Sequence, residues 1–205
     1  MGTKERRERI RQATRQGILD GARQIAQQES WSALTIRKLA EHIEYSPSIV
    51  YEYFASKDEI LHALLREGFR ILAASMEYGQ HSTEDVSQQV VRVSEAYWQF
   101  ARDNPDLYQV MHGLGGVAID NAARAEAVQA VCAIAEGTLV AWAKENQVLL
   151  PDPLGSTEIM WSLLHGLVSL TLIDRLDADE GHAKQLLSNG IQALLQGWKY
   201  AVTSI

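Results

Sequence analysis

The chain has 205 residues, of which 46% are hydrophobic and 22% charged, and this ordinary globular composition excludes disorder and collagen-like repeats. A single cysteine, Cys132, permits no disulfide within one chain and favours a reducing cytoplasm. The formal net charge of −7 argues, taken alone, against a nucleic-acid partner. No membrane association is expected, because the most apolar stretch, 159–173, is shorter than the ~20 residues that cross a bilayer.

The charge is unevenly distributed along the chain. Residues 1–70 carry 12 Lys and Arg against 10 Asp and Glu, whereas residues 71–205 carry 7 against 16. Six of the basic side chains lie within the first 15 residues. This asymmetry predicts an N-terminal module that binds a polyanion, attached to an acidic body outside that surface.

Helical periodicity dominates from the N-terminus onward. A first helix is expected at 6–28, with Ile10, Ile18, Ala22 and Ile25 on one apolar stripe, and Trp31 in the connection after it. Two short helices follow. Thr35 is expected to cap the first, 36–43, and Ser46 to cap the second, 47–54, which has Pro47 at its first position.

The remaining helices are longer and mostly amphipathic. Ser56 and Glu59 form a capping box that opens a helix at 56–78. Further helices are expected at 84–102, 105–112, 121–146, 156–174 and 181–202, with a glycine-rich break at 113–116 and a linker at 151–155. The fold class is therefore all-α, with about nine helices.

The segment from Thr35 to Phe54 has the size of a DNA-binding helix–turn–helix. The free backbone N–H groups at the start of each short helix are preformed sites for phosphate. The outward positions of the second helix carry short or aromatic donors, which can lie close to base edges: Ser46, Ser48, Tyr51 and Tyr53.

Residues 34–57, LTIRKLAEHIEYSPSIVYEYFASK, resemble the TetR/AcrR family of bacterial transcription regulators. The shared positions are Thr35, the Leu39-Ala40 pair, Ser46, Tyr51-x-x-Phe54 as core, and Lys57, and the match continues over about residues 8–75. Beyond it the resemblance is loose, through Asn104-Pro105-Asp106-Leu107-Tyr108 and Trp161-Ser-Leu-Leu-His165-Gly166.

The resemblance implies a DNA-binding domain at 1–55, linked through helix 56–78 to a ligand-binding and dimerisation domain at 79–205. Thr35, Arg37, Lys57 and the Tyr51 hydroxyl would hold phosphates, while Ser46, Pro47, Ser48 and Tyr53 would face the major groove. The turn departs from the family at Glu44, where a glycine is usual. A positive φ there would cost about 1 kcal/mol and would place an acid near DNA.

The acidic half has an aromatic and sulfur inventory that suits a pocket for a small hydrophobic ligand. The expected pocket residues are Tyr97, Phe100, Tyr108, Met111, His112, Trp142, Trp161 and His165. Plain core packing for each residue, and a buried hydrogen-bonded role for each histidine, stay open. The resemblance implies a homodimer through the last two helices, with an interface at Leu163, Leu167, Leu170, Leu187, Ile191, Leu194 and Trp198.

The expected function is that of a ligand-responsive transcriptional regulator, a repressor released from a palindromic operator in double-stranded DNA. No cofactor, metal site or catalytic residue is expected, since the sequence has no metal-spaced histidines, nucleophile elbow or phosphate loop. The alternative is a helical small-molecule carrier or enzyme whose N-terminal helices are purely structural. Two local questions stay open: a core role for Tyr51, and whether the basic run 4–15 is a solvated face or contacts phosphate.

Overall fold

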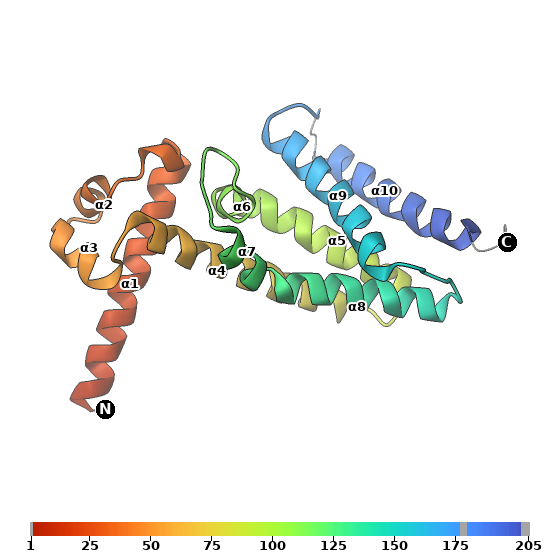
Figure 1. Cartoon of the computed structure of the whole chain (residues 1–205), viewed down its shortest axis with the longest axis horizontal. Coiled ribbons are helices and arrows are strands. Elements are labelled where there is room, and N and C mark those ends of the chain that lie inside the picture. The colour runs from red at the N-terminus through yellow and green to blue at the C-terminus, as the bar shows by residue number, and fades with distance from the viewer. Residues whose placement is uncertain (1, 177–179, 202–205) are drawn as a thin grey trace. The chain divides into compact units, whose positions relative to one another are not determined.

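The computed structural model describes residues 2–176 and 180–201, and within them all regular secondary structure is helical (Figure 1). This confirms the all-α fold. The elements are α1 (Thr3–Gln28), the 3₁₀ turn η1 (Trp31–Ala33), α2 (Ile36–His42), α3 (Pro47–Tyr53), α4 (Lys57–Gln80), α5 (Val86–Asp103), α6 (Pro105–His112), α7 (Asn121–Ala127), α8 (Gln129–Glu145), α9 (Pro153–Leu172) and α10 (Glu180–Ala201).

The chain packs as two compact units. Unit 1 comprises the described residues up to Gly68 together with Asp106–Ala127, and unit 2 comprises Phe69–Pro105 together with the described residues from Val128 onward. Helix α4 runs without interruption from one unit into the other. This division differs from the expected boundary after residue 78, because α6 and α7 pack with the N-terminal helices.

The core of unit 1 forms where α1 meets the short helices and the first half of α4. Helix α1 contributes Ile18, Leu19, Ala22 and Ile25, all buried. Partners on the other helices include Leu39, Val50, Phe54, Ile60, Leu64 and Leu65. Ile10, expected on the same stripe, is 56% exposed, because α1 extends beyond this core toward its N-terminus.

The helix starts follow the predicted chemistry only in part. The Thr35 hydroxyl accepts a hydrogen bond from the Lys38 N–H at 3.1 Å, as expected of a cap. Ser46 occupies the N-cap position of α3, but its hydroxyl pairs with that of Ser48 at 2.7 Å instead of accepting from the helix. At α4, Glu59 N–H donates to the Ser56 hydroxyl at 3.2 Å.

Three helices end with a non-glycine residue in the left-handed region. Glu44 after α2, Gln147 after α8 and Asp174 after α9 have φ of 58°, 56° and 52°. In each case the following N–H donates to a carbonyl five residues earlier, as Tyr45 does to Ala40 at 2.8 Å. This is the Schellman arrangement, which satisfies terminal carbonyls and offsets part of the strain.

In unit 2, helix α5 packs against α8, α9 and α10. The core combines aliphatic side chains with buried aromatic ones, namely Val90, Val93, Tyr97, Trp98, Leu139, Trp142, Met160, Leu164, Leu187 and Ile191. The helix expected at 121–146 is interrupted at Val128, which no proline or glycine marks. The linker predicted at 151–155 is shorter in the structure, because α9 already begins at Pro153. The Asp152 carboxylate caps this helix by accepting from the Gly155 N–H.

Among the described residues, no individual helix combines the length and the hydropathy of a membrane span; only α7 and α8, taken together across their break, reach them.

Candidate nucleic-acid interface and ligand groove

Helices α2 and α3 expose the polar positions expected to meet DNA. Six of them are exposed: Thr35, Arg37, Ser46, Pro47, Ser48 and Tyr51. Tyr53 and Lys57 are half-buried. The Tyr51 side chain is 55% exposed, so it is not a core tyrosine; the buried residues of this segment are Val50 and Phe54.

The turn between the two helices has the geometry that the sequence suggested. Glu44 adopts φ +58°, in the region where glycine is usual, and its side chain is exposed. Helix α1 lies close behind this turn at Gly21, where an added Cβ would clash with the Cγ2 methyl of Ile43. The close approach of α1 therefore fixes the end of α2 and the start of the turn.

Lys57, expected to hold a phosphate, has a partner within the chain. Its ammonium donates to the Trp31 carbonyl at 3.0 Å. The Trp31 indole N–H in turn donates to the backbone carbonyl of Asp106 at 3.0 Å. Because the ammonium has three donors, two remain for other acceptors.

Sequence reasoning missed the role of Asp106 at the start of α6. Its buried carboxylate accepts from Arg23 Nε at 2.6 Å, from Arg23 Nη2 at 3.3 Å and from Gln27 Nε2 at 3.1 Å. Burial lowers the pKa of Arg23, but the hydrogen bond and charge of Asp106 outweigh it and raise the pKa above its usual value. The Asn104-Pro105-Asp106 motif was visible, but nothing in the sequence paired it with α1.

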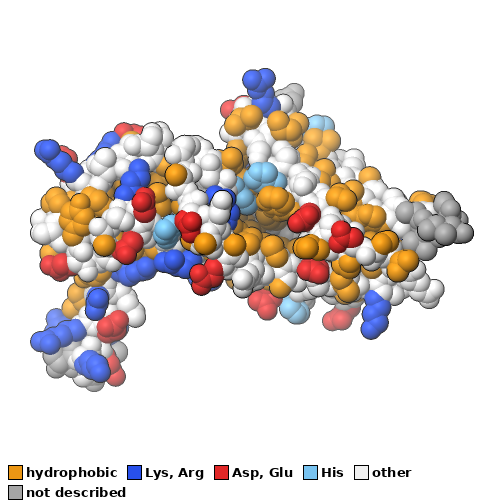
Figure 2. Space-filling model, viewed as in Figure 1, with side chains coloured by type: hydrophobic (Ala, Val, Ile, Leu, Met, Phe, Trp, Pro, Cys, Tyr) orange, Lys and Arg blue, Asp and Glu red, His pale blue; other side chains and the backbone are white. Residues whose placement is uncertain are grey.

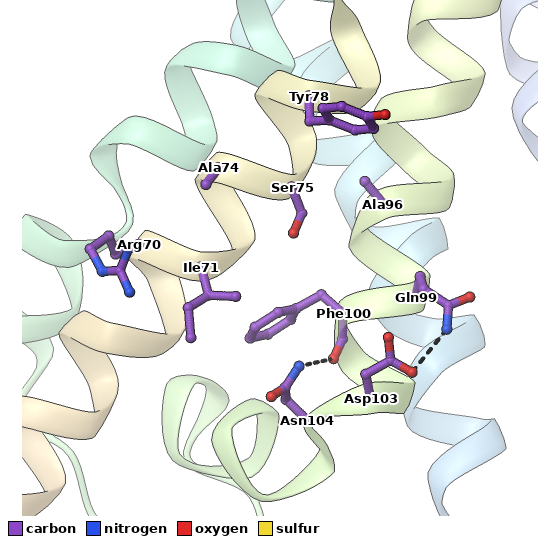
Figure 3. A pocket seen from close by; sticks show the side chains of 10 residues that line it. All are labelled: Arg70, Ile71, Ala74, Ser75, Tyr78, Ala96, Gln99, Phe100, Asp103 and Asn104. Atoms are coloured by element: carbon purple, nitrogen blue, oxygen red, sulfur yellow. Dashed lines mark hydrogen bonds between the residues drawn. The ribbon is translucent and has the colours of Figure 1, made fainter. Parts of the chain in front are cut away.

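Unit 2 contains an open groove of about 590 Å³ between α4 and α5 (Figure 3). The two helices approach closely at Gly79, where an added Cβ would lie 2.9 Å from the Arg92 carbonyl oxygen. Beyond this contact the groove is lined by Arg70, Ile71, Ala74, Ser75, Tyr78, Ala96, Gln99, Phe100, Asp103 and Asn104. Its centre is apolar, with Phe100 and Ile71 pointing toward each other, and polar side chains lie at its edges.

The expected pocket residues do not form one site. Tyr108, Met111 and His112 belong to α6 in unit 1, and the first two are buried there. In unit 2, Tyr97 and Trp142 are buried core residues, and Phe100 alone of the expected set lines the groove.

Trp161 and His165 form a stacked pair on α9. Their ring centroids lie 5.2 Å apart, and the Trp161 indole N–H donates to the Tyr97 hydroxyl at 3.2 Å. Burial lowers the pKa of His165, which favours the neutral form of its imidazole. The pKa of Cys132 is raised, by burial first and then by the charges of Glu136 and Glu158, which disfavours a reactive thiolate. Among the described residues, no three His, Cys, Asp or Glu side chains are grouped as metal ligands.

The expected interface residues divide between surface and core. Leu187 and Ile191 are buried within unit 2 and leave no surface for a partner. Leu163, Leu167, Leu194 and Trp198 are half-buried, and Leu170 is exposed. The Trp198 ring lies 6.3 Å from that of Trp142, so it packs toward the unit's own core.

Comparison with known proteins gives two family matches. Residues 18–64 match the model of bacterial regulatory proteins of the tetR family, and residues 90–194 match that of the tetracyclin repressor-like C-terminal domain. An uncharacterized HTH-type transcriptional regulator of Haemophilus influenzae is 24% identical over 90 residues, 44% of this chain and 48% of that protein. The chain thus spans about half the length of this curated relative.

Solved structures share the fold over most of both chains. A protein of unknown function from Rhodococcus sp. RHA1 aligns with a TM-score of 0.78 at 19% identity, over 90% of this chain and 95% of that one. The transcriptional regulator FadR from Bacillus subtilis, solved in complex with stearoyl-CoA, aligns with a TM-score of 0.75 at 16% identity, over 89% and 98%. With the second family match alone spanning half of the sequence, the chain belongs to the tetR family of bacterial transcriptional regulators.

Proposed function

We propose that the protein is a homodimeric repressor that leaves a palindromic operator when a small hydrophobic molecule binds unit 2. The observation that carries the proposal is the exposed polar row of α3. Ser46, Ser48 and Tyr51 are exposed on a short helix whose buried side is held by Val50. Short donors of this kind let a helix lie close to base edges in the major groove.

The proposed ligand site is the groove between α4 and α5, which replaces the dispersed pocket expected from the sequence. Its volume of about 590 Å³ falls within the range of small-molecule sites. One wall is α4, which begins at Lys57, shortly after the end of α3, the proposed recognition helix. A ligand that moves α4 in unit 2 would therefore displace the start of the same helix, and a coupling of about 1–3 kcal/mol would weaken operator binding roughly 5–150-fold.

The proposed dimer surface is the outer face of α9. Ile159 and Leu170 are exposed on this helix, and Leu163 lies between them over Gly190 of α10. The three leucine and isoleucine positions follow helical spacing and form one apolar stripe. A two-fold dimer through this stripe would present two recognition helices to adjacent half-sites.

The dimer is tested by sedimentation of Leu170→Asp, which should yield monomers. Leu154→Asp is the matched control, because Leu154 is also exposed but lies about 160° around α9 at 100° per residue. A dimer that survives Leu170→Asp, or is lost equally in the control, would move the interface elsewhere.

DNA recognition is tested by selecting bound duplexes from genomic fragments and measuring their affinity at several salt concentrations. Ser48→Ala should change which bases are preferred, whereas Lys57→Ala should weaken all duplexes and lower the salt slope by about 0.9. Lys38→Ala is the matched control, since the Lys38 ammonium is paired with Glu29. Binding of apolar ligands with no duplex bound at low salt would favour the carrier or enzyme alternative.

The groove is tested by screening apolar carboxylic acids, alcohols and amines for release of the selected duplex. Ala96→Trp should fill the groove and abolish release while leaving operator affinity within about twofold. A variant that still responds to the ligand with unchanged potency would place the ligand site elsewhere in the protein.

A further inference from the structure

Helix α1 projects well beyond the core of unit 1. Its first buried side chain is Ile18, and residues 4–17 are all exposed except Thr14, which is half-buried. At 1.5 Å per residue this stretch is about 20 Å long. It also precedes the part of the chain that matches the tetR family model, which begins at residue 18.

The projecting stretch carries arginines on one face of α1, and from Ile18 onward the same face packs into the core of unit 1. Arg7, Arg11 and Arg15 are spaced by four residues and run into Ile18 on the same face of the helix. The other faces mix Arg6 and Arg9 with Glu5 and Glu8. Figure 2 shows Lys and Arg side chains gathered over this part of α1, at the lower left.

This arginine face lies beside the recognition helix. Arg7, Ile10 and Arg11 of α1 line a hollow of about 320 Å³ together with Glu52 and Tyr53 at the end of α3. One turn farther along, the Arg15 guanidinium lies 4.9 Å from the centre of the Phe54 ring. The basic stripe therefore lies beside the C-terminal end of α3, next to Glu52 and Tyr53.

We infer that Arg7 and Arg11 bind the phosphate backbone of duplex DNA next to the bases that α3 contacts, an inference that depends on the proposed function. In the described part of the chain, both guanidinium groups lack an ion pair with Glu52, so they are available to an outside anion. A membrane surface would require an apolar stripe beside the cations, and Ile10 is the one large apolar side chain there.

The test compares two double variants of the full chain that remove the same charge. Arg7→Ala/Arg11→Ala should lower the salt slope of binding to the selected duplex by about 1.8, at 0.9 per phosphate contact. The preference for that duplex over a scrambled one should stay unchanged, because phosphate contacts carry no base information. Arg6→Ala/Arg9→Ala, on the other side of the helix, should change the slope much less. Alanine preserves the helix, as circular dichroism will verify.

A third variant should change the affinity for DNA in the opposite direction. Glu52→Gln removes the carboxylate that lines the same hollow, so it should strengthen binding in the parent protein and have less effect when Arg7 and Arg11 are absent. Equal losses from the two arginine pairs, or no loss from either, would overturn the inference. Failure of the parent protein to bind any duplex would instead refute the proposed function.

Discussion

The buried ion pair between Arg23 and Asp106 allows a quantitative prediction for Asp106→Asn. The Asp106 side chain is 2% exposed and that of Arg23 is 20% exposed. Removing one partner of such a pair costs about 3–5 kcal/mol, and the residual exposure of Arg23 favours the lower end, about 3 kcal/mol. Arginine cannot escape the penalty by losing its proton, since it stays charged in proteins.

Urea unfolding of the parent, Asp106→Asn, Arg23→Met and the double variant measures this effect. The double variant should be little less stable than either single one, because removing the second partner also removes the unpaired charge. Additive losses within about 0.5 kcal/mol would show that the two side chains do not act as a pair, and would refute the reasoning.

Three further predictions concern single positions. Glu44→Gly should stabilise the protein by up to about 1 kcal/mol in urea unfolding, because glycine relieves the positive φ; a loss of stability would contradict this. Gly21→Ala should destabilise it, since overpacking against Ile43 costs about 1–3 kcal/mol, more than the about 1 kcal/mol that alanine gains in a helix. The control Gly17→Ala, with open space around it, should stabilise. His165 has a lowered pKa when folded, so unfolding takes up a proton and stability falls as the pH drops through its unfolded pKa of about 6.5. In melting temperatures measured over a pH series, His165→Gln should reduce this loss of stability on acidification. An unchanged profile would exclude His165 as the source of the loss.

The helix–turn–helix was predictable because its signals are local. Thr35 caps its helix through a neighbour three residues away, and the strain at Glu44 follows from a turn only a few residues long. Periodicity likewise predicted the buried positions Ile18, Ala22 and Ile25 of α1, whereas Ile10 on the same stripe is exposed.

Contacts between distant segments were not predictable from one sequence. The partners Arg23 and Asp106 lie 83 residues apart, and periodicity carries no information about which helices meet. The predicted set of pocket residues did not come together for the same reason. The aromatic residues of the acidic half looked like one pocket, yet Tyr108 packs in unit 1 and Trp142 in the core of unit 2. The interface residues Leu187 and Ile191 were misplaced because α10 has an apolar stripe wide enough to face either a partner or its own unit.

The projecting part of α1 also affects how the protein must be handled. None of residues 4–17 is buried, and a helical segment held by so few contacts opens at little cost. Its Lys and Arg residues, six within the first 15 positions, are cleavage sites for trypsin-like proteases. Trace proteolysis during purification would trim this stretch while leaving the core and α3 intact. Intact mass should therefore be checked before affinities from different preparations are compared.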